Sequence, residues 1–291
     1  MFLSTTFKRR IKGYMTAQMW HSSSIHTLQA EILQTQLLST QKYSDPRRLE
    51  HFGYKAYSQG DEDGIIQEIF NRIGTTNRFF VEFGVQDGLE SNTHFLLLQG
   101  WNGVFMEGSS EYVAQIQEKF ASPISEGRLK VMNAFITREN INDLMQENGA
   151  AKIDEIDLLS IDIDGNDYYI FEAIECIHPR VIVVEYNAKF PPPARWIMPY
   201  NKEHVWDGTD RQGASLQALA DLGEKKGYRL VATNLNGINA FFVRNDLADS
   251  NLFALQSPKE LYNPMRLMSF RSGHPTKEYL GNHALTLRWL R

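Results

Sequence analysis

The chain has 291 residues, of which 42% are hydrophobic and 22% are charged, with a formal net charge of −5. This composition supports a sizeable core and excludes disordered and collagen-like chains, and the acidic balance disfavours general nucleic-acid binding. The single cysteine, Cys176, excludes a disulfide framework and a cysteine-rich zinc module, and we predict a cytoplasmic protein. The longest apolar runs are far shorter than the roughly 20 residues of a transmembrane helix, so no membrane-spanning segment is expected.

Residues 1–53 are predicted to form a basic tail followed by a helix. Residues 1–30 contain no acidic side chain and four basic ones close together: Lys8, Arg9, Arg10 and Lys12. Residues 13–24 are too polar for a secretory signal. A helix across residues 25–42 would carry one apolar side, made of Leu28, Ile32, Leu37 and Leu38. We expect it to pack on the rest of the chain or on a second copy, giving a homodimer; a basic arm that meets membrane or nucleic acid is the alternative.

From Tyr54 onward, segments with strand and helix patterns alternate. Helices are predicted at residues 61–73, 93–99, 109–120, 137–148 and 167–177, and strands at 79–83, 103–106, 129–134, 157–163 and 180–186. Helical connections of this length between strands produce right-handed crossovers and a parallel sheet. We therefore predict an α/β domain over residues 54–245, followed by a C-terminal extension, residues 246–291.

The last two strands differ from the first five because a hairpin joins them. After a helix at 214–226, the strands 228–233 and 238–243 are separated by only four residues, NLNG, so the last strand must run antiparallel. This differs from the six parallel strands of nicotinamide-binding domains. It is typical of class I methyltransferases that use S-adenosyl-L-methionine (SAM). The predicted fold is a Rossmann-like, mostly parallel seven-stranded sheet with an antiparallel last strand and helices on both faces.

A glycine motif, VEFGVQDG, ends the first strand. Ligands of open α/β sheets bind at the carboxyl ends of strands, and Gly84 would let the chain turn with a positive φ and approach a ligand closely. Gly84 and Gly88 are spaced as G-x-x-x-G and not as the G-x-G-x-x-G of a dinucleotide site. The loop therefore favours a cofactor with an amino-acid tail, with a plain strand-ending turn as the alternative.

An acidic residue, Glu107, ends the second strand. It lies 25 residues after Glu82, near the offset of about 20 residues that is expected of a ribose-binding carboxylate. An ordinary surface glutamate is the alternative. Asn133 and Ala134, at the end of the third strand, are candidates to flank an adenine.

Three aspartates are crowded at the end of the fourth strand, in the segment SIDIDGND. Such a cluster is costly unless its members are paired, solvated or bound to a cation. On an extended strand Asp162 and Asp164 would point the same way and meet one divalent ion, Mg or Mn, or flank one reacting hydroxyl. We expect Asp167 to cap the next helix. Solvated strand-end acids are the alternative for the whole group.

The fifth strand and the connection after it provide candidate substrate-binding residues. Glu185 and Asn187 would face the same cleft as the aspartates. The connection 188–213 is long, and long connections at this end of a sheet are usually functional. Its mixture of aromatic and polar side chains is typical of a lid over a sugar or another flat polar substrate, with Trp196, Tyr200 and Trp206 as candidate contacts. His204 is a candidate general base. An ordinary surface flap is the alternative.

These motifs resemble those of the FkbM-like SAM-dependent methyltransferases over about residues 54–245. FVEFGVQDG resembles the family's glycine motif, GVFMEGS its ribose-acid strand and IDLLSIDIDGND its acidic strand; residues 180–186 and 237–244 (GINAFFVR) resemble its fifth and last strands. The resemblance implies that Glu82, Gly84 and Gly88 line the methionine part of SAM, Glu107 its ribose and Asp162 the methyl-transfer site. We add Asp87, from the same loop, to the cofactor-binding candidates.

The expected activity is O-methylation of a hydroxyl on a saccharide or a glycosylated small molecule, with SAM and optionally a divalent cation as cofactors. Asp164, or a metal held by Asp162 and Asp164, would take the hydroxyl proton or lower its pKa. Two other functions stay open. One is a metal-dependent glycosyltransferase that uses Asp162-Ile163-Asp164, and the other is a non-catalytic binding module on the same fold.

Overall fold

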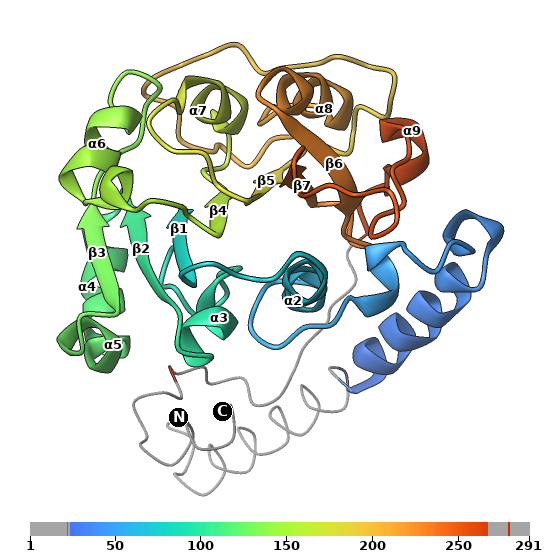
Figure 1. The fold of residues 1–291 in the computed structure, drawn as a ribbon, viewed down its shortest axis with the longest axis horizontal. Coiled ribbons are helices and arrows are strands. Elements are labelled where there is room, and N and C mark those ends of the chain that lie inside the picture. The colour runs from blue at the N-terminus through green and yellow to red at the C-terminus, as the bar shows by residue number, and fades with distance from the viewer. Residues whose placement is uncertain (1–21, 23, 267–278, 280–291) are drawn as a thin grey trace, which may run out of the picture.

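The computed structural model describes residues 22, 24–266 and 279. The basic residues 8–12 and most of the predicted C-terminal extension therefore lie outside the described residues. One sheet of seven strands, in the order β3-β2-β1-β4-β5-β7-β6, runs through the molecule with helices on both of its faces (Figure 1).

The sheet has the predicted mixture of parallel and antiparallel strands. Its strands are β1 (Phe79–Phe83), β2 (Asn102–Glu107), β3 (Leu129–Asn133), β4 (Leu158–Ile161), β5 (Val181–Glu185), β6 (Tyr228–Thr233) and β7 (Asn239–Arg244). The first five run parallel, and β7 lies antiparallel between β5 and β6. The predicted fold class is thus confirmed. The hairpin turn is closed by Gly237, whose φ is +71° and whose N–H donates to the carbonyl oxygen of Asn234 at 3.0 Å.

Helices cover both faces because alternate strand residues are apolar on both sides. The helices are α2 (Glu62–Ile73), α3 (His94–Leu98), α4 (Ser110–Lys119), α5 (Ala121–Ser125), α6 (Ile141–Glu147), α7 (Asp167–Ala173), α8 (Leu216–Lys225) and α9 (Pro258–Leu261). On β5, Ile182 and Val184 belong to the core that α6, α7 and α8 cover, whereas Val181 and Val183 belong to the core under α2, α3 and α4. Burial of both faces is the usual state of a parallel sheet.

Several predicted elements are shorter in the structure than in the sequence analysis, and three of them have a clear local cause. The fourth strand ends at Ile161, not at 163, because Asp164 adopts a φ of +56° and turns the chain out of the sheet. The third crossover helix begins at Ile141, not at 137, because the side chain of Asn140 accepts the N–H of Thr137 in a preceding turn. The helix predicted at 167–177 ends at Ala173, whose carbonyl oxygen accepts the side-chain amide of Asn142.

The N-terminal helix packs on the domain through only part of its predicted apolar side. Residues 24–38 are helical, and Leu37 and Leu38 contact a small cluster that contains Tyr43 and Leu235 of the β6–β7 turn. Leu28 and Ile32 instead are each 58% exposed. The packing on the rest of the chain is therefore confirmed for the end of the helix, and the homodimer stays a prediction. Within the described part of the chain, every helix is too short or too polar to cross a membrane.

Candidate functional site

The carboxyl ends of β1, β2, β4 and β5 meet at one edge of the sheet, and Gly84 lies where two of them touch. Gly84 follows β1 with a φ of +66°, as expected, and its N–H donates to the carbonyl oxygen of Met106 at 3.0 Å. A Cβ atom at this position would lie 1.6 Å from the carbonyl oxygen of Asp162. Only glycine therefore allows the loop after β1 to contact the end of β4 so closely.

Glu82 anchors the far end of the same loop. Its side chain is only 3% exposed, and its carboxylate accepts the N–H groups of Asn92 and Thr93 at 2.8 and 3.1 Å. Burial raises the pKa of Glu82 to about 7, against the opposing effect of these hydrogen bonds. Glu82 thus fixes the path of residues 84–93, and a direct contact with a cofactor stays a prediction.

Glu107 fastens the loop after β1 to the loop after β2. It is 8% exposed, and its two carboxylate oxygens accept the N–H groups of Gln86 and Ser109, each at 2.8 Å. Each oxygen therefore keeps a second lone pair for a ligand. Asn133 and Ala134 lie beside it, since the side-chain amide of Asn133 and the N–H of Ala134 both donate to the carbonyl oxygen of Glu107 at 2.9 Å.

The remaining two loop candidates face helix α4. Asp87 forms an ion pair of 2.7 Å with Lys119, and it also accepts the N–H of Leu89. Gly88 has a φ of +78°, and a Cβ atom there would lie 2.8 Å from the ring of Phe120. In the structure both residues therefore hold the loop against α4, and their contact with a cofactor stays a prediction.

Three carboxylates converge at the centre of the edge. Asp162, Asp164 and Glu185 each offer an oxygen atom, and these atoms lie within 4.8 Å of one another. Burial and then repulsion from Asp162 and the neighbouring aspartates raise the pKa of Glu185 well above its usual value. The same two causes act on Asp162, and burial also raises the pKa of Asp164. This group of three, called the acid cluster below, is poised to take protons or to bind a cation.

The proximity of Asp162 and Asp164 was predicted, but its geometric reason was wrong. The two residues are not on an extended strand, because β4 ends at Ile161 and the chain turns at Asp164. Glu185, which we expected to bind substrate, joins them from the end of β5. Its place beside the aspartates is the one that we expected from adjacent fourth and fifth strands, and its contact with substrate stays a prediction.

Asp167 holds the turn that presents the acid cluster. It is the first residue of α7, whose N-cap residue Asn166 makes no side-chain cap, so the predicted capping role of Asp167 is wrong. Its buried carboxylate instead accepts the N–H groups of Ile163 and Gly165, each at 2.8 Å. Burial raises the pKa of Asp167 to about 6. The residue acts on the site by fixing the backbone between Asp162 and α7.

The insertion, residues 188–213, lies over this turn through His204. The Nε2 atom of His204 is 3.1 Å from the carbonyl oxygen of Asp164, which can only accept, so Nε2 donates this hydrogen bond. A Cβ atom on Gly165 would lie 2.2 Å from the histidine ring. The structure thus brings His204 and the acid cluster together, as a candidate base beside the carboxylates.

Asn187 ties down the base of the insertion. Its side-chain amide donates to the carbonyl oxygens of Asp210 and Gln212 at 2.8 and 2.9 Å, and its oxygen accepts the N–H of Lys189 at 3.0 Å. These bonds connect the first and last residues of the insertion. The hydrogen bonds of the amide are therefore made within the chain, and a contact with substrate stays a prediction.

The three aromatic candidates are spread along the insertion. Trp196 stacks on Phe190 with ring centroids 4.2 Å apart, and Trp206 is 51% exposed. The hydroxyl of Tyr200 donates to Glu139 at 2.5 Å, and the guanidinium of Arg138 lies 4.1 Å from the centre of its ring. These two contacts hold the insertion against the residues that precede α6. The sequence analysis did not predict them, because Arg138 and Glu139 resemble any exposed pair of charged residues.

Helix α2 also contributes to the site, which the sequence analysis missed. Buried Glu62, at its first turn, accepts the side-chain amides of Asn234 and Asn239 at 2.7 and 3.1 Å. Asn239 pairs directly with Glu185 across β5 and β7, and the charge of Glu62 adds to the raised pKa of Asp162. In the sequence, the acidic residues at the start of α2 indicated only where a helix begins. The effect of Glu62 on Asp162 depends on how α2 packs in the tertiary fold.

No family model matches the sequence, and no curated protein matches it. Among solved structures, the glycopeptide N-methyltransferase MtfA complexed with sinefungin is 13% identical, with a TM-score of 0.38 over 65% of this chain and 87% of that chain. A putative caffeoyl-CoA O-methyltransferase from Staphylococcus aureus is 12% identical, with a TM-score of 0.41 over 63% and 82%. An O-methyltransferase family protein from Burkholderia thailandensis is 7% identical, with a TM-score of 0.38 over 65% and 59%.

Proposed function

We propose that this chain is a SAM-dependent O-methyltransferase that acts on a hydroxyl of a saccharide or a glycosylated small molecule. The observation that carries the proposal is the acid cluster, Asp162, Asp164 and Glu185, next to the Gly84 loop and to Glu107 at one edge of the sheet. The antiparallel last strand, β7, also supports the proposal, since the sequence analysis treats it as typical of class I SAM-dependent methyltransferases.

SAM would supply a methyl group on a sulfonium. The residues present suit it, because Glu107 keeps two lone pairs at the edge of the sheet for the two hydroxyls of a ribose. Asn133 and Ala134 lie beside Glu107 and would flank the adenine. The loop after β1 begins at Gly84, close to Asp162. A cofactor bound along this loop would therefore have its amino-acid tail near the acid cluster. In this arrangement Glu82 and Asp167 position the two loops and need no contact with the cofactor.

The acid cluster would take the proton that methylation releases. When a hydroxyl oxygen bonds to a methyl carbon, its proton must pass to a base, and a carboxyl with a raised pKa is suited to this near neutral pH. Asp164 is the candidate base, because it projects from a turn that Asp167 fixes on one side and His204 contacts on the other. The Nδ1 atom of His204 is the second candidate. Trp196, Tyr200 and Trp206 would hold the acceptor under the insertion.

A divalent cation is the second way in which the cluster would serve the same reaction. Carboxylate oxygens are the ligands that Mg and Mn prefer. Asp162, Asp164 and Glu185 together provide three, and a cation would offset the repulsion that, after burial, raises the pKa values of Asp162 and Glu185. Such an ion would lower the pKa of a bound acceptor hydroxyl. In this form of the proposal Glu185 is a ligand and not a substrate contact.

The test is calorimetry of the full chain with SAM, S-adenosylhomocysteine and a panel of nucleotide sugars, with and without manganese. We expect both adenosyl compounds to bind, and labelled methyl to pass from SAM to a saccharide hydroxyl. Binding of nucleotide sugars alone, dependent on manganese, would overturn the proposal in favour of the glycosyltransferase alternative. No binding of either class would leave a non-catalytic module.

A further inference from the structure

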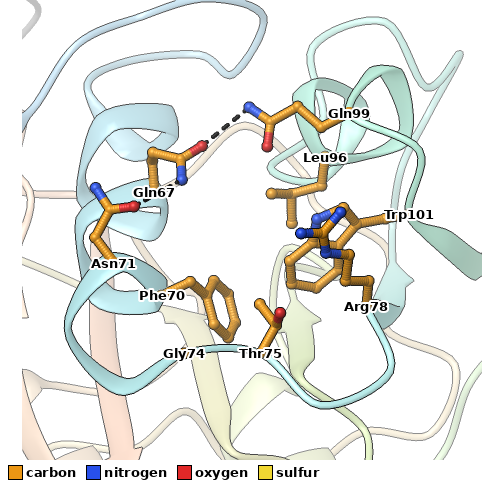
Figure 2. Close-up of a pocket in the computed structure, with 9 residues that line it drawn as sticks. All are labelled: Gln67, Phe70, Asn71, Gly74, Thr75, Arg78, Leu96, Gln99 and Trp101. Carbon is orange, nitrogen blue, oxygen red and sulfur yellow. Dashed lines mark hydrogen bonds between the residues drawn. The ribbon is translucent and has the colours of Figure 1, made fainter. Parts of the chain in front are cut away.

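A second pocket lies at the opposite edge of the sheet, where β1 begins. It has a volume of about 430 Å³ and lies between α2, α3 and the loop that enters β1. Figure 2 shows its lining residues, with those of α2 facing Leu96, Trp101 and Arg78 across the opening and Gln99 above it. Because β1 separates this pocket from the Gly84 loop, it is not part of the site proposed above.

The loop that carries Arg78 is held rigidly by one buried carboxylate. Asp157 accepts the consecutive N–H groups of Thr76, Asn77 and Arg78 at 3.0, 3.1 and 2.7 Å. It is also paired with Arg180 at 3.1 Å. In this loop Arg78 adopts a φ of +54°, a left-handed conformation that is strained for arginine and that proteins often keep at ligand sites. The backbone thus fixes the position from which the Arg78 side chain projects at the pocket.

The guanidinium of Arg78 is available to a ligand. Its side chain is exposed, and among the described residues no carboxylate or carbonyl oxygen pairs with it. A guanidinium offers a planar fork of donors that matches a carboxylate or a phosphate with two parallel hydrogen bonds. An exposed arginine at the rim of a pocket therefore favours an anionic ligand there.

The other walls combine an amide network with an aromatic floor. The side chain of Gln99 on α3 donates to that of Gln67 at 3.0 Å, and Gln67 donates to Asn71 at 3.2 Å, which joins the two helices around the pocket. Phe70 and Trp101 pack edge to face beneath them at 5.0 Å. Each amide keeps unused donor or acceptor capacity for hydroxyl groups. The pocket is thus rigid, polar and positively charged at its rim.

We propose that this pocket binds a small polyhydroxylated organic anion, whose carboxylate or phosphate pairs with Arg78 and whose hydroxyl groups bond to the side chains of Gln67, Asn71 and Gln99. The ligand must carry a negative charge because Arg78 is positively charged. The rest of the ligand must both donate and accept hydrogen bonds because the amides do both. A carboxylate and a phosphate satisfy the guanidinium equally well, so the two sources are separated by experiment.

The test is calorimetry of the full chain with glucose 6-phosphate, gluconate and uncharged glucose. We expect at least one of the two anions to bind about tenfold or more tightly than glucose, and the comparison of the two shows whether phosphate or carboxylate is preferred. Arg78→Gly removes the guanidinium and relieves the positive φ, so it leaves the fold intact and weakens anion binding about tenfold or more. The matched control is Arg229→Gln, which removes an exposed arginine from β6 and leaves the affinity unchanged.

A further variant separates this pocket from the proposed acceptor site, where a sugar phosphate would also bind as substrate. Asp164→Asn changes the acid cluster and leaves anion binding at the Arg78 pocket unchanged. The inference is wrong if neither anion binds more tightly than glucose, or if Arg78→Gly binds the anion as the wild type does. It is also wrong if Asp164→Asn and not Arg78→Gly removes the binding.

Discussion

At each of the two edges of the sheet, a buried aspartate accepts backbone N–H groups of a turn that contains a residue with positive φ. The charges around the two aspartates differ. At the carboxyl edge, Asp167 accepts the N–H groups around a turn in which Asp164 has a φ of +56°. At the amino edge, Asp157 does the same for the turn that holds Arg78 at +54°. Asp157 has a cationic partner in Arg180, whereas Asp167 lies among acidic residues. A buried aspartate can thus serve as a permanent brace or as part of a site that changes its protonation.

The largest effect is expected from Asp157→Ala, which removes the brace at the amino edge. It leaves the buried Arg180 with only the more distant carboxylate of Glu155, at 3.8 Å, and three consecutive N–H groups without their acceptor. Breaking a buried pair in this way costs about 3–5 kcal/mol. Urea unfolding of the variant measures this loss, with Asp154→Ala, at an exposed position nearby, as the control. If Asp157→Ala loses no more free energy of unfolding than Asp154→Ala, then Asp157 does not brace the amino edge of the sheet.

Asp164→Asn is expected to lower methyl transfer without weakening the fold. Asparagine tolerates the same left-handed backbone, so the turn is kept while the charge that accepts the proton is lost. Turnover falls by about 10²-fold or more, as for removal of a general base, and the affinity for SAM is unchanged. The loss of one charge also reduces the repulsion on Asp162 and Glu185, so the variant unfolds at a slightly higher temperature.

Steady-state kinetics and calorimetry check this prediction, and a chelator then separates its two forms. Loss of wild-type activity with the chelator, restored by magnesium or manganese, indicates that the acid cluster holds an ion. Activity that is indifferent to the chelator indicates direct proton transfer to a carboxylate. A fully active Asp164→Asn would refute both forms and leave His204 as the next candidate.

Glu107→Ala is expected to weaken SAM binding by about ten- to hundredfold, which corresponds to the loss of charge-assisted hydrogen bonds. The variant also releases the N–H groups of Gln86 and Ser109, so Glu107→Gln is the companion that keeps the shape and removes the charge. Calorimetry with SAM measures both, and Glu111→Ala, on the exposed face of α4, is the control. Wild-type affinity in both Glu107 variants would place the ribose elsewhere.

A further prediction concerns the pH dependence of stability at the carboxyl edge. The pKa of Glu82 is raised from 4.5 to about 7, so the folded chain binds this proton more tightly than the unfolded chain. The resulting stabilisation is complete below the unfolded pKa and is lost as the pH rises through about 7. Glu82→Gln, which carries no titrating group, therefore gains stability relative to the wild type between about pH 5 and about pH 8. Urea unfolding of both proteins at the two pH values measures the free energies of unfolding. The prediction is refuted if the difference between the two proteins is the same at both pH values.

The sequence was sufficient to predict the sheet because its signals are local. Short β-branched and aromatic runs marked each strand, and the four-residue NLNG turn alone required β7 to run antiparallel. Gly84 was also predictable, because a glycine directly after a strand indicates a turn with a positive φ. These features depend on neighbouring residues, which a single sequence contains.

The parts of the site that the sequence did not predict depend on contacts between distant segments. Asp167 lies at the start of a helix, so the sequence predicted that it caps that helix. Its carboxylate instead accepts backbone N–H groups of the preceding turn. The charge of Glu62 acts on Asp162 only because α2 packs beside the β6–β7 turn. The pocket at Arg78 likewise requires α2, α3 and β1 to be assembled, and none of its residues forms a sequence motif.

The clasp between the two ends of the described chain has a consequence for how the protein is made. Tyr43 is buried and bonds through its hydroxyl to the side chain of Asn263, 220 residues later, and Lys42 bonds to the same residue at 3.2 Å. On the ribosome these hydrogen bonds therefore cannot form until Asn263 has left the exit tunnel. The nascent sheet can form before that moment, so the contact of Lys42 and Tyr43 with Asn263 forms after the strands that it covers.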